Sequence, residues 1–358
     1  MDKRYEAYCL VDRFFYDSPT AATSSGGPAG LGSGFATAAR PAPSGWHRAE
    51  HDGWVILRPI GAVLPDQGWK IHVSVRLDDA ADTVETVWEY CVAHRIAFKF
   101  LKSRGLLHLR NAKYADRGAS GKLVTIYPVD EAELHRVLTG LGALLAGRPG
   151  PYVLSDLRYG PGPLYVRYGA IAERYCRSAT GRLVPALTDP DGNLVPDPRG
   201  PVFTLPPWVE PPDFLRPHLA ARDSVTLRDL PYRVTRVLHF SNGGGVYQAT
   251  DTRTGETVVL KEARPHAGLD RTGADAVTRL HREADALRAL DGLGVAPRLR
   301  DRFTLGEHHF LVLDFLPGEP LNRAVVARFP LGGLATADRA EYTRWAVRVC
   351  TRAEELVA

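Results

Sequence analysis

The sequence predicts an α+β protein with two domains. Its 358 residues fit two domains of ordinary size. Short segments in which apolar and polar residues alternate predict strands, and segments with apolar residues three and four apart predict helices between them. Residues 176–222 are rich in proline and turn residues, which predicts a long ordered loop or an interdomain connector. A new strand pattern begins near residue 230, after this region.

Composition excludes several classes of protein. The chain is 44% hydrophobic and 24% charged, as in globular proteins, and its formal charge of +4 comes without a dense basic patch or tail. We therefore expect no nucleic-acid partner. The N-terminal apolar runs are interrupted by charges and no segment is long enough to span a membrane, so we expect a cytoplasmic protein. The four cysteines are far apart and form no CxxC pair, which indicates neither a metal site nor a disulfide framework.

The first half of the chain predicts a sheet with two helices, preceded by a flexible loop. Residues 17–46 are rich in Gly, Ala, Ser and Pro, a composition typical of such a loop. Strands are expected over residues 53–61, 69–75, 96–101, 121–129, 150–160 and 163–171. Helices are expected over residues 81–95 and 130–147, the second with an acidic start and a glycine end.

One expected strand, "WKIHVSV" at residues 69–75, raises the question of an active site. Lys70, His72 and Ser74 alternate with apolar residues and would share one face of the strand. Taken alone, such a face is most often simply solvated, and Ser74 is expected only to pack or make a minor hydrogen bond. Lys99 stands between two phenylalanines, where a lysine must pair, extend to water or lose its proton. Other cationic and phenolic residues on expected strands or their ends are Arg117, Tyr127, Arg158 and Arg167.

The second region resembles the N-terminal lobe of a eukaryotic-type protein kinase. Two strands flank a glycine-rich turn, Gly243 to Gly245, with Gly244 in the third loop position, and glycines at such a turn let backbone N–H groups approach phosphates. Lys261 in "VVLK" would pair with those phosphates, and Glu283 on the next helix would hold the lysine. The run "VYQATDTRTGETVVLK" carries the resemblance, which covers residues 231–358.

This region departs from the kinase pattern in two ways. The first two glycine positions of the loop hold His239 and Ser241, so the loop is atypical. No H-R-D-x-x-x-x-N and no D-F-G segment occurs before Ala358, so the base and the magnesium ligands of phosphoryl transfer are missing. The chain is therefore expected to be a fragment without kinase activity of its own. ATP and Mg are expected as cofactors of the full-length kinase.

The first domain resembles the phosphothreonine lyase family, most closely the N-terminal lyase domain of class III lanthipeptide synthetases. The matching pieces are "WKIHVS", "FKFLKS", "DRGASGKLVTIYP", "GPYVLSDLRYG" and "YVRYGA", which lie within residues 50–172. Within them "GASGK" lacks the spacing of a phosphate-binding P-loop. A kinase-like domain after such a lyase domain is the architecture of those synthetases. The expected division is a lyase domain over residues 1–215, with a mixed sheet and helices, a linker over 216–230, and a kinase N-lobe over 231–358.

This resemblance implies a reaction and a set of roles. The kinase phosphorylates Ser and Thr of a precursor peptide, and the lyase eliminates the phosphate to give dehydroalanine or dehydrobutyrine. The substrate is then a lanthipeptide precursor with a leader and a phosphorylated core, and the lyase needs no metal and no other cofactor. The implied roles are general base for Lys99, enolate stabilisation for Lys70, general acid for His72, phosphate or base contact for Tyr127, and phosphate binding for Arg117, Arg158 and, more weakly, Arg167.

Two other functions remain open from the sequence. The first domain would equally suit a phosphopeptide-binding module that docks substrate for a kinase, or a regulatory domain of a Ser/Thr kinase. A lysine and a histidine two residues apart on one strand favour catalysis, because a binding site needs no general acid.

Overall fold

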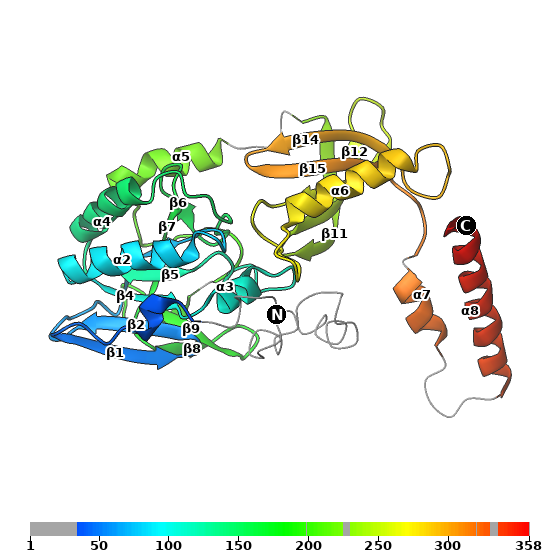
Figure 1. The fold of residues 1–358 in the computed structure, drawn as a ribbon. Helices are drawn as coiled ribbons and strands as arrows, with labels where there is room; N and C mark the ends of the chain where they lie inside the picture. The colour runs from blue at the N-terminus through cyan, green and yellow to red at the C-terminus, as the bar shows by residue number, and fades with distance from the viewer. Residues whose placement is uncertain (1–33, 198, 225–229, 320, 330–335, 358) are drawn as a thin grey trace.

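The computed structural model describes residues 34–197, 199–224, 230–319, 321–329 and 336–357, and its main body consists of two large sheets with their helices and a small third sheet (Figure 1). The α+β class is confirmed. The first domain contains a seven-stranded sheet in the order β1-β2-β4-β5-β3-β7-β6. Its strands are β1 (Trp46–His51), β2 (Trp54–Pro59), β3 (Gln67–Val73), β4 (Ala97–Leu101), β5 (Val124–Tyr127), β6 (Leu157–Arg158) and β7 (Leu164–Ala170). We expected a mixed sheet, but every pairing between these strands is antiparallel, because alternation shows strands and not their direction.

Two helices cover one face of this sheet and make the main core. They are α2 (Ala80–His94) and α4 (Glu131–Leu144), close to the predicted ranges. Their apolar sides, including Val87 and Leu138, join a cluster with strand residues such as Ile71 and Phe98. The Asp130 side chain caps α4 by accepting a hydrogen bond from the Glu133 backbone N–H at 2.7 Å. The opposite face of the sheet is therefore left for the polar residues.

Several segments differ from the sequence predictions. Of the expected flexible loop, residues 17–33 lie outside the described chain, whereas 34–46 are ordered: Phe35 is buried, its N–H bonds the Lys102 carbonyl at 2.9 Å, and η1 (Ala36–Ala39) follows. An unpredicted helix α3 (Arg104–Asn111) begins at the Ser103 cap. The expected strand 150–160 is mostly loop, because two prolines near its start leave only β6 to pair.

The proline-rich region is also more structured than predicted. It forms a small antiparallel sheet of β8 (Tyr175–Arg177), β9 (Leu183–Thr188) and β10 (Leu194–Pro196). After η2 (Asp213–Leu215), the expected linker begins as a helix, α5 (Arg216–Asp223). This helix rests on the first domain, since Nδ1 of His218 accepts a hydrogen bond from the Gly160 N–H and its ring packs beside Tyr159.

The second domain is a five-stranded antiparallel sheet with one helix against it. The strand order is β11-β12-β13-β15-β14, and the helix is α6. Their bounds are β11 (Tyr232–Ser241), β12 (Gly244–Asp251), β13 (Thr257–Ala263), α6 (Ala276–Ala289), β14 (Leu299–Leu305) and β15 (His308–Asp314). Further along the chain lie α7 (Leu321–Arg328) and α8 (Thr336–Val357), drawn apart from the two sheets in Figure 1. Among the described residues, no helix has both the length and the apolar character that a membrane span requires.

The core of the first domain gives a stability prediction. Phe98 is 1% exposed and packs edge-on against Trp46 and Trp88. Phe98→Ala is expected to lower the free energy of unfolding by about 3 to 5 kcal/mol, because it removes buried contacts and leaves a cavity. Urea unfolding measures this loss. Leu144→Ala, at a 56% exposed position on α4, is the control and should change stability by less than about 0.5 kcal/mol; equal losses in both variants would contradict this core.

Candidate active site

Strand register gathers the predicted catalytic residues on the sheet face opposite α2 and α4. His72 on β3 stands opposite Thr125 on β5, and Thr125 stands opposite Lys99 on β4. Lys70 on the same face stands opposite Arg167 on β7. Neighbouring strands lie about 4.8 Å apart, so the backbones of Lys99 and His72 are separated by roughly 10 Å, with the small Thr125 between them. A substrate group can therefore lie over β5 and meet both side chains.

A cavity of about 550 Å³ opens over this face, and most of its charged lining residues are cations. Its cationic lining residues are Lys70, Lys99, Arg110, Lys122, Arg167, Arg174 and Arg199. The acidic residues in the lining are fewer, namely Asp52, Asp116 and Glu173. Such a surplus of positive charge suits an anionic ligand. Within the described residues, no group of three or more His, Cys, Asp or Glu side chains is arranged to hold a metal ion.

Lys99 is packed against an aromatic ring that it shares with a second cation. Its Nζ lies 4.7 Å from the centre of the Trp54 ring, and Cζ of Arg110, at the end of α3, lies 4.9 Å from that centre. Phe98 and Phe100 point into the core, so they do not supply the apolar setting expected from the sequence. Burial in the cavity, followed by the repulsion of Arg110, lowers the pKa of Lys99 to about 8.

Lys70 is more deeply buried than Lys99. Its Nζ donates a hydrogen bond to the Ala170 carbonyl. Burial is the main cause that lowers its pKa to about 7, and the nearby Arg167 and Arg199 add repulsion. Two lysines with pKa values near neutrality therefore stand on one face. Ser74, just after the end of β3, makes a minor side-chain hydrogen bond to the Pro151 carbonyl at 2.6 Å, as expected.

His72 is held by a buried carboxylate that the sequence reasoning missed. Its Nδ1 bonds Oδ2 of Asp156, and Asp156 also lies 3.4 Å from Nζ of Lys122. Burial alone would raise the pKa of Asp156, but the interaction with the His72 ring and the charge of Lys122 hold it far below its usual range, so the carboxylate is ionised and can only accept hydrogen bonds. Nδ1 of His72 therefore carries the proton. Burial lowers the pKa of His72 to about 4, which leaves Nε2 unprotonated at neutral pH.

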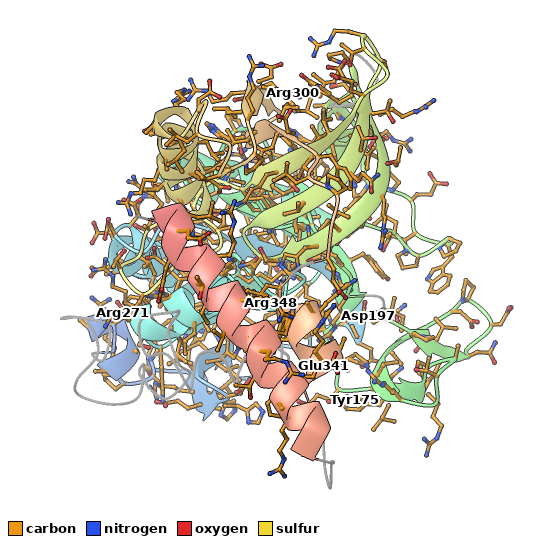
Figure 2. The ribbon with its side chains drawn as sticks, turned by 90° about the vertical axis from the view of Figure 1, so that its right-hand side faces the viewer. Tyr175, Asp197, Arg271, Arg300, Glu341 and Arg348 are labelled. Carbon is orange, nitrogen blue, oxygen red and sulfur yellow. The ribbon has the colours of Figure 1, made fainter. Side chains whose placement is uncertain are left out.

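The remaining lining residues are fixed by the segment that carries the small sheet. Arg167 forms a buried ion pair with Asp197, the residue after β10, and Nε of Arg199 lies 3.4 Å from the same carboxylate. Figure 2 shows Asp197 and Tyr175 of β8 on one side of the molecule, on this segment. Burial raises the pKa of Tyr127, so its hydroxyl keeps its proton and can donate a hydrogen bond.

Two predicted phosphate-binding arginines lie away from the cavity. Arg117 stacks on Phe240 of the second domain, with Cζ 4.4 Å from the ring centre. Arg158 pairs with Glu307 at 2.7 Å and donates to two carbonyls of its own turn. Among the predicted arginines, only Arg167 lines the cavity. Spacing along the chain could not distinguish them, because side-chain direction at a strand end depends on the turn that follows.

The kinase-like part shows the predicted ion pair but an unexpected glycine turn. Lys261 on β13 pairs with Glu283 on α6. Gly244 has φ +145°, and a Cβ there would meet the Glu262 carbonyl oxygen at 2.1 Å, so only glycine fits. Gly244 and Gly245 belong to β12 and pair with β11, while Gly243 is in the turn. The Gly243 N–H donates to Oγ of Ser241 and is thus already bonded.

Comparison with known proteins identifies the family. Residues 34–225 match the family model described as "RamC, N-terminal domain". The whole chain is 56% identical, over 360 residues, to the "Probable SapB synthase" of Streptomyces coelicolor, of which it spans 38%. The chain belongs to the RamC N-terminal domain family. The matches confirm the class III lanthipeptide synthetase resemblance on which the predicted roles rest.

The RamC-type domain supplies several site residues that sequence reasoning missed. They are Trp54, Arg110, Lys122, Asp156 and Arg199. Two of them stand in segments that had carried the resemblance: Lys122 ends "GASGK", and Asp156 lies in "SDLRYG". A carboxylate in reach of His72, the predicted acid, was the signal to look for. Arg110 and Arg199 had no such signal, because they come from an unpredicted helix and from the loop-like region.

The buried lysine of this RamC-type domain predicts a pH-dependent cost to stability. The pKa of Lys70 is about 7 in the folded chain and near its usual 10.5 when unfolded, so between these values the unfolded chain holds the extra proton. The cost of the buried charge is therefore complete below pH 7 and disappears towards pH 10. Lys70→Met should be more stable than the wild type near pH 6.5, and this advantage should shrink as pH rises.

Urea unfolding between about pH 6.5 and pH 9 measures this advantage. Lys102→Met is the matched control. Lys102 is half-exposed, and its Nζ lies 4.0 Å from Oε2 of Glu50 in a surface ion pair. Its stability difference from wild type should not vary in this way. A Lys70→Met advantage that stays constant or grows with pH would contradict a depressed lysine pKa.

Proposed function

We propose that this chain eliminates phosphate from phosphoserine and phosphothreonine of a lanthipeptide precursor, giving dehydroalanine and dehydrobutyrine. The observation that supports this most is the register that sets Lys99 and His72 on either side of Thr125 in a cation-lined cavity. Elimination needs a base and an acid that reach different atoms of one residue, the Cα proton and the leaving oxygen. Two such groups separated by one strand match that requirement.

Lys99 is the base in this proposal. An ordinary lysine is almost wholly protonated at neutral pH, but a pKa of about 8 leaves a useful fraction as free amine. The amine takes the Cα proton, and the electrons of the C–H bond form the Cα–Cβ double bond. The ring of Trp54 fixes the position of the amine and keeps water from one side of it. The charge that develops on the neighbouring carbonyl is met by Lys70, which stands on the same face.

His72 is the acid that protonates the leaving phosphate. Burial keeps Nε2 of His72 unprotonated at neutral pH, so the proton must be gained when substrate binds. A phosphate ester carries about −1.5 to −2 charges at neutral pH. This negative charge offsets Lys122 and Lys70, which disfavour the imidazolium, and thereby raises the pKa of His72. The Cβ–O bond then breaks, and the departing oxygen takes the Nε2 proton. Asp156 holds the ring and stabilises its charged form.

Phosphate binding is assigned to cations of the cavity. Among the cavity arginines, Arg110 has the longest ion pair, a 3.8 Å separation from Asp52, and its planar fork suits two phosphate oxygens. Lys122 and Arg199 add charge at the other walls. Arg167 is held by Asp197, so its part is to shape the site and repel protons from Lys70. The Tyr127 hydroxyl is available as a neutral donor.

The second domain is proposed to belong to the kinase that makes the substrate. In the full-length protein it would phosphorylate Ser and Thr of the precursor with ATP and Mg, and the Lys261–Glu283 pair supports this assignment. The printed name of the relative, a probable SapB synthase, supports a peptide product. The precursor, with its leader and phosphorylated core, is thus the proposed partner of the chain.

The lyase proposal predicts elimination without ATP. A precursor peptide that carries phosphoserine should lose phosphoric acid on incubation with the chain, and mass spectrometry after thiol addition should detect the dehydroamino acid. Lys99→Ala and His72→Ala should each abolish the product, because one removes the base and the other the acid. Lys102→Ala, three residues along the same segment but half-exposed, should keep full activity.

The same assay separates the alternatives. Recovery of unmodified serine would indicate hydrolysis and refute the lyase proposal. Binding of the phosphopeptide without any dehydroamino acid would favour the phosphopeptide-binding module. Near-full elimination by Lys99→Ala or His72→Ala would remove that residue from its role.

The phosphate assignment predicts a contrast between two arginines. Arg110→Met should raise KM for the phosphopeptide on the order of 10- to 100-fold, because it removes charge-assisted hydrogen bonds to the phosphate. Arg158→Met should leave KM nearly unchanged, since Arg158 is tied to Glu307 outside the cavity. Steady-state kinetics gives both values. A larger effect at Arg158 than at Arg110 would overturn the assignment.

A further inference from the structure

The two domains meet through the glycine turn of the second domain. Asn242, at the tip of the β11–β12 hairpin, is fully buried against the first domain. Its backbone N–H donates to the Lys113 carbonyl at 2.8 Å. Its side-chain Nδ2 donates to the Ala112 carbonyl at 3.1 Å and to Oγ of Ser120 at 2.9 Å. In Figure 1 the second domain meets the first beside α3, which ends at Asn111.

The segment bonded by Asn242, residues 111–122, forms one wall of the cavity. Oδ1 of Asn111 accepts hydrogen bonds from Oγ of Ser120 and from the Gly121 N–H, which closes the loop between them. This loop contributes Asp116, Gly118 and Ala119 to the cavity lining. Lys122 follows at once and contacts Asp156, the partner of His72. Asn242 therefore bonds Ser120, which stands two residues before Lys122, a cation of the site.

A buried arginine extends the contact to the segment that carries Asp156. Arg264 is 1% exposed, and its Nη1 donates to the carbonyl and to Oδ1 of Asn242 at 2.9 and 3.2 Å. Its Nη2 donates to the Tyr152 carbonyl at 2.6 Å, four residues before Asp156. Lys122 and Asp156 therefore stand on two segments that are both bonded to this one turn. A buried guanidinium without these acceptors would be costly, so the turn and the arginine hold each other in place.

The same bonds occupy the turn. The N–H of Asn242 donates to the first domain, and the N–H of Gly243 donates to Ser241. A glycine turn that cradles phosphate presents free N–H groups, and at these two positions none is free. His239 and Ser241 replace two glycines of the kinase pattern, which fits a turn that bonds the first domain and does not cradle phosphate.

We propose that Asn242 is a positioning residue for elimination, and that the glycine turn is a structural part of the lyase site. This rests on the proposed lyase function. Asn242 fixes the 111–122 segment, and this orients Lys122 against Asp156 and, through Asp156, the ring of His72. Loss of the side chain frees the segment without removing any group that touches substrate. Displacement of catalytic groups by about 1 Å can cost on the order of 100-fold in rate.

The test uses the full chain with a phosphoserine precursor peptide. Asn242→Ala should lower kcat on the order of tenfold or more while KM changes little, because Arg110 and the other phosphate ligands remain. Ser120→Ala, a smaller change, should act in the same direction. The double variant should lose less than the product of the two single losses, since the two side chains share the hydrogen bond between Nδ2 of Asn242 and Oγ of Ser120. Thr254→Ala, which alters an exposed turn of the same sheet, is the matched control and should keep the wild-type kcat.

Amide hydrogen exchange keeps the inference separate from the lyase proposal. Exchange over residues 111–122 should be faster in Asn242→Ala than in wild type, whether or not the chain eliminates phosphate. If wild type eliminates phosphate and both single variants keep its kcat, the positioning role is wrong. Unchanged exchange over 111–122 in Asn242→Ala would overturn the docking itself. If Asn242→Ala fails to fold, Ser120→Ala gives the same two readouts.

Discussion

The site depends on holding several positive charges close together and out of water. Burial disfavours the charged form of a lysine, and neighbouring cations disfavour it further, so the pKa values of Lys70 and Lys99 fall to about 7 and 8. A structure can maintain such a cluster only where acids behind it offset part of the repulsion. Asp156 and Asp197 do this from fully buried positions, each bonded to one basic residue and close to a second. The remaining surplus of charge is what an incoming phosphate would relieve.

The sheet makes this arrangement possible because one face packs on helices and the other faces the cavity. Helices α2 and α4 cover one face and provide the apolar core, which anchors the strands. The other face carries functional side chains at fixed strand spacing, over a loop-built wall. Rigid strands set Lys70, His72 and Lys99, whereas loops and α3 supply Arg110, Lys122 and Arg199. The precise part of the proposed chemistry is therefore on the rigid elements, and the adaptable phosphate contacts are on the loops.

Contact between the domains gives the loops their support. The turn of the second domain meets the 111–122 segment through Asn242, and Arg264 reaches the segment that leads to Asp156. These bonds are buried, so a substitution that removes one partner leaves the other unsatisfied. A loop-built wall near the proposed acid is thus stabilised by residues far away in the sequence. The kinase-like fold and the lyase-like site are therefore linked by buried hydrogen bonds as well as by the covalent chain.

Local sequence determined strands β2, β3, β4, β5 and β7, the helices α2 and α4, and the alternation that places Lys70 and His72 on one face, because periods of two and 3.6 are properties of the chain itself. The motifs also determined the family. Tertiary structure alone decided which arginines enter the cavity, that Asp156 holds His72, and that the glycine turn bonds the first domain. Arg117 and Arg158 have the right chemistry at plausible spacings, yet they meet Phe240 and Glu307 instead. Their partners come from about 120 and 150 residues away, a separation that no local pattern encodes.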